Sequence, residues 1–213
     1  MLRLRFACAM LALLVGASVA YAGVPEDSTA AGASPVWDGS VSLFYYALPQ
    51  DTDFPLVVGT ADRGALHGEV RYNYEDLKTV SIFGGWNIEG GESVEFLLTP
   101  MAGVAFGQTT GLIPALELSL AAGAFDLYVE GEYLFDLEDG EASFFYTWSE
   151  LGVTLGPVRT GLTAQRQRIF QTPLEIDRGL FAQLMQGPAT VSFYAFNIAT
   201  ESSFLIFGLA VEF

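Results

Sequence analysis

The sequence predicts an all-β protein that closes as an antiparallel transmembrane β-barrel of about twelve strands. Two observations lead to this fold class. The 213-residue chain is 51% hydrophobic and has a mean hydropathy of +0.38, yet after residue 23 it has no apolar run of about 18 residues that could form a membrane-spanning helix. Instead, polar and apolar side chains alternate, as in residues 66–74, "LHGEVRYNY". A period of two is typical of a strand with one polar and one apolar face.

Residues 1–22 have the layout of a cleaved secretory signal peptide. Arg3 and Arg5 precede an apolar run at about 7–15, and an A-x-A cleavage site follows at 20–22. The apolar run is shorter than a bilayer-spanning helix requires, which disfavours the alternative of a membrane anchor. We therefore expect cleavage after residue 22 and export across the inner membrane.

Charge and cysteine content exclude several classes of function. Cys8, the single cysteine, lies in the signal segment, so the exported chain has no disulfide, thiol ligand or thiol nucleophile. Without residues 1–22, seven Lys and Arg side chains remain against 25 Asp and Glu, a formal charge of −18. A protein that binds the phosphates of a nucleic acid needs a basic surface, so no nucleic-acid partner is predicted. No cofactor is predicted either.

Turn residues divide the rest of the chain into short segments about a dozen residues apart. A polar, Pro-containing lead-in at 23–36 is expected to be flexible, and the barrel is expected to span 37–213. Twelve strands are even in number, as single-chain barrels require, while ten is the alternative because the second strand is the weakest. The predicted strands are 37–48, 54–61, 64–74, 78–88, 93–106, 112–122, 125–136, 142–154, 157–167, 178–186, 189–199 and 203–213.

Alternation alone does not separate a membrane barrel from a soluble β-sandwich, because both have one polar and one apolar face. Aromatic side chains near strand ends are typical of the girdles that mark the two membrane interfaces. The alternative interpretation is that these aromatic residues are ordinary members of a protein core. The candidate girdle residues are Trp37, Tyr74, Trp86, Phe106 and Phe135.

The last strand decides between the two folds. In "SFLIFGLAVEF", Phe213 is preceded at alternate positions by Val211, Leu209, Phe207 and Leu205. This strand resembles the C-terminal strand of bacterial outer-membrane β-barrel proteins, the porin-like superfamily. The resemblance covers eleven residues by motif and the exported chain by pattern, and it indicates no subfamily. It implies a place in the outer membrane among its lipids, and recognition by the barrel assembly machinery through Phe213, Val211, Leu209 and Phe207.

Connection lengths agree with this topology. If Phe213 lies on the periplasmic side, counting back places the short turns at 155–157 and 186–188 on that side and the long connection at 166–179 outside. Short periplasmic turns and longer extracellular loops are the expected asymmetry.

Polar residues on the interior parity predict a net acidic lumen, because charges are costly against lipid. We expect small solutes, cations above all, to pass through it by diffusion. The alternative is a closed structural or partner-binding barrel, in which arginines tie the carboxylates into a plug. The predicted lumen-lining residues are His67, Glu69, Arg71, Asn73, Glu95, Glu117, Asp126, Glu130, Glu132, Glu150, Arg159 and Gln165.

An enzyme is not predicted, but one alternative is a lipid A or phospholipid hydrolase centred on His67. Such a site needs a serine hydroxyl within hydrogen-bond reach of the imidazole, and Ser81 on the next strand is the candidate if the register allows. Glu69 or Asn73 would then orient the ring. No G-x-S-x-G motif is present.

No metal site is predicted, since a lone histidine is a poor nucleus for one. The acidic stretch 136–141 is expected to be a solvated loop, with divalent-cation binding as the alternative. The cluster "QRQR" at 165–168 enters the longest outer connection and is suited to contact lipid phosphates.

Overall fold

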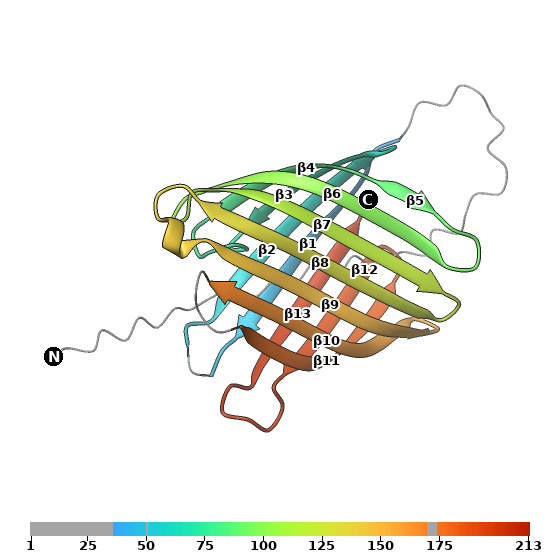
Figure 1. Ribbon diagram of the computed structural model, residues 1–213. Coiled ribbons are helices and arrows are strands. Elements are labelled where there is room, and N and C mark those ends of the chain that lie inside the picture. The colour runs from blue at the N-terminus through green and yellow to red at the C-terminus, as the bar shows by residue number, and fades with distance from the viewer. Residues whose placement is uncertain (1–35, 50, 170–173) are drawn as a thin grey trace.

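A computed structural model describes residues 36–49, 51–169 and 174–213, and side chains at 168 and 169 are not described. The predicted signal peptide and all but the last residue of the predicted lead-in lie outside these ranges. Figure 1 shows a β-barrel whose strands run obliquely around a common axis.

The described residues form thirteen β-strands and one short 3₁₀ helix, η1, at Gly140–Ala142. When β4 and β5 are taken together, each strand end lies within three residues of its predicted position, and β8 matches its predicted range. Their bounds are β1 Asp38–Ala47, β2 Phe54–Arg63, β3 Leu66–Tyr72, β4 Val80–Trp86, β5 Ile88–Gly90, β6 Glu95–Phe106, β7 Gly111–Ala122, β8 Phe125–Asp136, β9 Phe144–Leu155, β10 Val158–Ile169, β11 Glu175–Gln186, β12 Ala189–Phe196 and β13 Phe204–Glu212.

Each strand pairs antiparallel with its neighbours, and β13 pairs with β1, so the sheet closes on itself. Both β4 and β5 pair with β6, and together they make one wall strand interrupted at Asn87. Within the described ranges the barrel therefore has twelve wall strands, which confirms the predicted fold and count. Closure pairs the wall on both sides of every strand except at the short β5, which pairs with β6 alone. A closed ladder of this kind is what a β-protein in lipid requires.

The wall has an apolar outer face. On β1, Ser42, Phe44 and Tyr46 are buried while Leu43 and Tyr45 are each 46% exposed. The same alternation places Leu205, Phe207, Leu209 and Val211 of β13 on the outer face. Large apolar side chains that are exposed on all of the long strands except β2 form the belt that a membrane barrel presents to lipid. No helix in the described ranges is long and apolar enough to cross a membrane.

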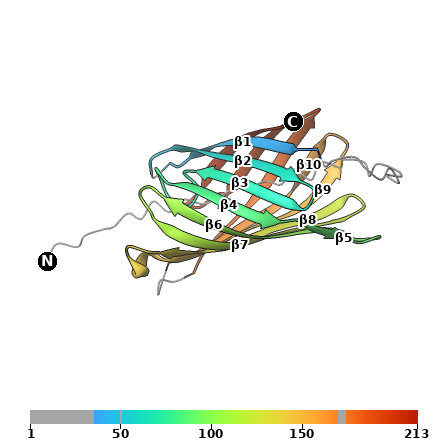
Figure 2. The same cartoon turned by 90° about the horizontal axis from the view of Figure 1, so that it is seen from above.

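The two ends of the barrel differ in how the strands are joined. At the end that holds both described chain termini, four turns begin with a glycine in the left-handed region, at Gly64, Gly123, Gly156 and Gly187. A glycine at the first of two turn residues is typical of tight hairpins. The opposite end has longer connections, such as 137–143 and 197–203, as Figure 2 shows from above. This asymmetry matches periplasmic turns at the first end and extracellular loops at the second.

Aromatic side chains fill the interior near the long connections. Tyr46 stacks on Phe54 with ring centroids 4.7 Å apart, and Phe196 stacks on Phe204 at 4.8 Å. Trp148 meets Phe196 edge-on at 5.3 Å. The core of the protein thus lies inside the barrel, at the end with the long loops.

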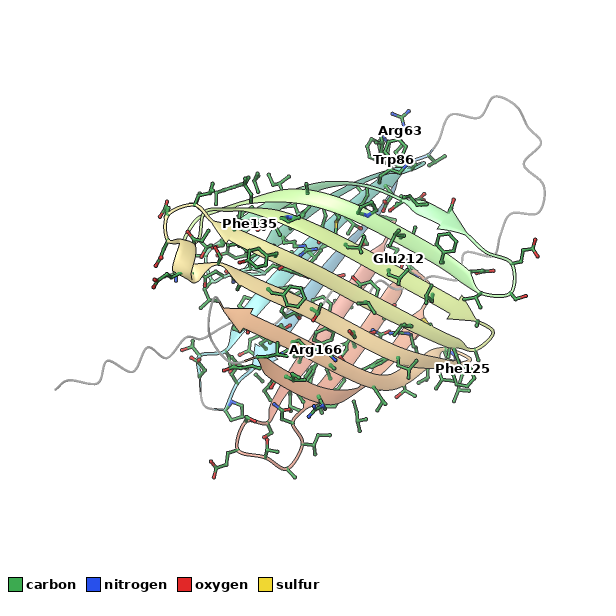
Figure 3. All side chains as sticks on the ribbon, viewed as in Figure 1. Arg63, Trp86, Phe125, Phe135, Arg166 and Glu212 are labelled. Carbon is green, nitrogen blue, oxygen red and sulfur yellow. The ribbon has the colours of Figure 1, made fainter. Side chains whose placement is uncertain are left out.

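Four of the five candidate girdle aromatics are exposed at strand ends, and Trp86 and Phe135 are labelled in Figure 3. The prediction was wrong for Tyr74, which is fully buried. Asn73 adopts a left-handed φ of 57°, which ends the strand alternation, and the following residues turn into the interior instead of toward lipid.

Candidate functional site in the barrel interior

The interior holds a charged group that we call the Arg71 cluster: Arg71 with Glu69, Glu75, Glu117, Glu130 and Glu132. The guanidinium of Arg71 is completely buried. It donates to Glu69 through Nε and to Glu132 through Nη1 at 2.9 Å, and its Nη2 lies 3.0 Å from Glu130 Oε1. Two more carboxylates are farther away: Glu75 Oε1 lies 3.7 Å from Arg71 Nη1, and Glu117 Oε1 lies 3.9 Å from Arg71 Nη2.

Strand register explains how these groups meet. Glu69 and Arg71 share the interior face of β3, and Glu117 on β7 lies directly opposite Glu130 on β8. Like charges directly opposite each other on a sheet repel. Arg71 reaches them although β4, β6 and β7 separate β3 from β8 around the wall. Its side chain therefore extends into the interior and joins parts of the wall that lie four strands apart.

Aromatic rings enclose the Arg71 guanidinium. Its Cζ lies 3.7 Å from the centroid of Tyr74 and 4.3 Å from that of Phe83. The Tyr74 hydroxyl donates to Glu130, and the Tyr128 hydroxyl donates to the same carboxylate at 3.4 Å. Cation–π contacts of this kind strengthen when the cation is desolvated.

Tyr74 and Glu75 enter the interior from the β3–β4 loop, residues 73–79, rather than from the wall. The Asn73 side chain anchors this loop by donating to Pro55 O at 2.8 Å and accepting from Lys78 N at 2.7 Å. The Thr109 hydroxyl also donates to Asp76 at 2.7 Å. No sequence pattern indicated this inward loop, so Tyr74 and Glu75 were not among the predicted lining residues.

Glu75 is the member of the Arg71 cluster that lies outside the strands. Burial raises the pKa of its carboxyl to about 7, although nearby Arg71 and the hydrogen bond that the Ser81 hydroxyl donates to it act in the opposite direction. Its charge therefore changes near neutral pH.

A second group, the Arg159 cluster, consists of Arg159, Asp126, Glu150, Gln183 and Tyr194. Arg159 donates to Asp126, to Glu150 at 2.5 Å and to Gln183 at 3.1 Å. Tyr194 donates to Glu150 at 3.0 Å and accepts from Gln183 at 2.8 Å. All five residues lie on strands, and each polar group has a partner.

In the Arg71 cluster, by contrast, some polar groups have no hydrogen-bond partner among the described residues. Five carboxylates surround one guanidinium, and within the described part of the chain one oxygen on each of Glu75, Glu117 and Glu132 accepts no hydrogen bond. Buried carboxylates without partners are costly. The arrangement attracts positive charge, in the form of a proton or a cation. Among the described residues, however, no group of three or more acidic, His or Cys side chains has the arrangement of a metal site.

His67 does not meet the serine that a hydrolase needs. Its Nδ1 lies 2.9 Å from Asp62 Oδ1 and its Nε2 3.4 Å from Glu69 Oε2. The register pairs His67 with Gly85, and Ser81 with Arg71, which leaves Ser81 four residues, or about 13 Å, along the strand. Ser81 instead donates to Glu75.

The remaining predicted lining residues lie apart from both clusters. Gln165 donates to Asp177 at 2.7 Å near the long loops. Asn73 anchors the β3–β4 loop, as described above. Glu95 is the first residue of β6 and is exposed, although it has the same parity as the buried Thr99 and Met101 of that strand.

No protein-family model matches the chain, and no curated protein matches it by sequence. Solved structures do match its fold. The KdgM porin superposes with a TM-score of 0.58 at 11% identity, covering 82% of this chain and 99% of that one. A KdgM porin in complex with disordered oligogalacturonate gives 0.61 at 10% identity over the same shares. OccK5 (OpdH) of Pseudomonas aeruginosa gives 0.45 at 7% identity, over 80% of this chain and 62% of that one. The KdgM similarity shows that this chain has a porin fold.

Proposed function

We propose that this protein is a porin-like channel of the bacterial outer membrane whose acidic interior favours small cations and cationic solutes. The observation that carries the proposal is the excess of carboxylates over guanidinium in the Arg71 cluster, at the centre of a porin-type barrel. Rings of acidic side chains are the usual basis of cation selectivity in pores.

The negative charge of the interior also disfavours the kind of ligand that is found with one structural neighbour. One KdgM structure contains oligogalacturonate, which is a chain of acidic sugars. Acidic solutes would meet carboxylates in the interior of the present barrel and would be repelled. The proposed solutes are therefore of the opposite charge.

Passage requires a conformational change at the Arg71 cluster. Arg71 and Glu130 are both 0% exposed, so water does not reach these two side chains in the described conformation. The β3–β4 loop supplies Tyr74 and Glu75 to this closure and is not part of the wall. We therefore propose that outward movement of this loop opens the channel.

The test is planar-bilayer conductance of refolded residues 23–213 in a salt gradient. We expect discrete steps whose reversal potential indicates cation selectivity, and the double variant Glu130→Gln/Glu132→Gln should reduce that selectivity. The matched control is Glu138→Gln/Glu141→Gln, since both residues are exposed in the connection between β8 and β9. A folded, inserted protein that never conducts would contradict the proposal.

The second candidate is a closed barrel that displays its outer loops or holds a partner. The buried ring stacks at the long-loop end and the bridge from Arg71 to β8 favour it. It predicts stable insertion without conductance, and the silence should persist in variants that release the β3–β4 loop.

Two partners complete the proposal: the surrounding outer-membrane lipid and the barrel assembly machinery. The exposed apolar face supports contact with lipid. The outward side chains of β13 support recognition of the last strand, since Phe207, Leu209 and Val211 are accessible and Phe213 is 78% exposed.

A further inference from the structure

A polar patch interrupts the apolar outer face near the long-loop end of β9, β10 and β11. We call it the outer polar patch and define it as Thr147, Ser149, Arg166 and Arg178. The two arginines are exposed and the two hydroxyl residues are partly exposed. Figure 3 labels Arg166 in the region of β9 to β11.

Register brings these four residues together although they come from three strands. Arg166 lies directly opposite Thr147, while Ala164 lies between Ser149 on one side and Arg178 on the other. Directly opposed β-carbons are about 5 Å apart and diagonal ones about 7 to 8 Å. Both guanidinium groups can therefore reach one ligand, and the small Ala164 between them leaves room for it.

The two arginines have no acidic partner in the part of the chain that the structure describes. Among the residues that the structure describes, no acidic side chain forms an ion pair with Arg166 or Arg178. Two adjacent positive charges repel each other, so the patch favours an anion. This contrasts with Arg71 and Arg159, which are both enclosed by carboxylates.

The depth of the patch indicates where this anion lies. Leu162 and Leu180 pair directly on the outer face and are 57% and 51% exposed, as expected within the apolar belt. Arg178 lies two residues, or about 7 Å, nearer the long loops than Leu180. Arg166 lies four residues, or about 13 Å, nearer them than Leu162. Arginine is costly at the centre of a membrane but not at its interface. Both side chains can therefore extend to the level of the lipid head groups.

We infer that the outer polar patch binds the phosphate groups of a lipid in the leaflet that faces the long loops. The planar guanidinium is suited to bidentate contact with phosphate, and the hydroxyls of Thr147 and Ser149 can donate to the same oxygens. The chain as a whole is strongly acidic, and this patch offers a phosphorylated lipid two adjacent positive charges. The inference does not depend on whether the barrel conducts.

The test is native mass spectrometry of refolded residues 23–213 titrated in detergent with bisphosphorylated lipid A or with the same lipid lacking both phosphates. We expect the phosphorylated form to bind and the Arg166→Gln/Arg178→Gln variant to bind it roughly tenfold more weakly or worse. Thr147→Val/Ser149→Ala should cause a smaller loss. Arg63→Gln, at the opposite end of the barrel, is the matched control.

Three outcomes would overturn the inference. The first is equal binding of both lipid forms, and the second is unchanged binding by the double arginine variant. The third is displacement of the lipid by millimolar inorganic phosphate, which would show a free-phosphate site instead. Heat-dependent mobility on gels confirms that each variant is folded. The exposed arginines are expected to leave that mobility unchanged when replaced by glutamine.

Discussion

The Arg71 and Arg159 clusters occupy the same barrel interior but differ in composition and in origin. Arg71 is fully buried among five carboxylates, two aromatic rings and a loop that enters from outside the wall. Arg159 lies on β10 among two carboxylates, one amide and the ring of Phe181, all from wall strands, and is 7% exposed. The Arg159 cluster satisfies its polar groups internally, whereas the Arg71 cluster leaves carboxylate oxygens without hydrogen bonds. Arg159 therefore reinforces the wall, while Arg71 holds the proposed closure.

The largest expected effect is on stability. Replacing Arg71 with Met leaves buried carboxylates without their guanidinium, and we expect a loss of about 3–5 kcal/mol in the free energy of unfolding. Arg159→Met should cost roughly half as much, since fewer acids depend on it. Urea titration of the barrels in vesicles measures both values. Equal losses would show that the two clusters do not differ in this way.

The next effect concerns the proposed closure. Tyr74→Leu removes the ring over Arg71 and the hydroxyl that contacts Glu130, so the β3–β4 loop should leave the interior more often. We expect a higher open probability in single-channel recordings. Tyr194→Phe, in the Arg159 cluster, is the control and should leave gating unchanged. Unchanged gating in the Tyr74 variant would assign the closure to other residues.

A smaller effect is expected on raising the pH. The pKa of Glu75 is about 7 in the folded barrel, against a usual value of 4.5, with burial as the main cause. The folded protein therefore holds this proton where the unfolded chain has lost it, and the resulting stabilisation declines as pH rises from about 4.5 to about 7. Loop docking should weaken over the same range, so channel opening should increase with pH. Glu75→Gln should remove this dependence, and a persistent pH response would assign it to another group.

The smallest expected effect is on ion selectivity. Neutralising one acid of the Arg71 cluster, by Glu117→Gln, should reduce the reversal potential in a salt gradient by a measurable fraction. Asp126→Asn, in the Arg159 cluster, should change it less, because Arg159 already neutralises that carboxylate. If the second variant had the larger effect, the pathway for ions would run beside Arg159 instead.

Sequence reasoning found the wall because strand alternation is a local property. The period of two in residues 66–72 and 205–213, and the glycine turns between strands, depend on near neighbours and on the need to keep charge away from lipid. The twelve-strand count and the outward face of the last strand followed from these patterns. The prediction for Tyr74 was wrong because the left-handed backbone at Asn73 breaks the alternation.

The sequence by itself thus determined a barrel with an apolar outer face and an acidic interior, because alternate residues of a strand face opposite sides of the wall and their polarity is given by the sequence. Tertiary structure decided which interior groups meet. Contact between Arg71 and Glu132, the placement of Ser81 opposite Arg71 instead of His67, and the row from Ser149 to Arg178 on the outer face all depend on strand register around the closed wall. Register is a property of pairs of strands, and the reach of Arg71 across the interior depends on how all twelve wall strands of the described barrel close together.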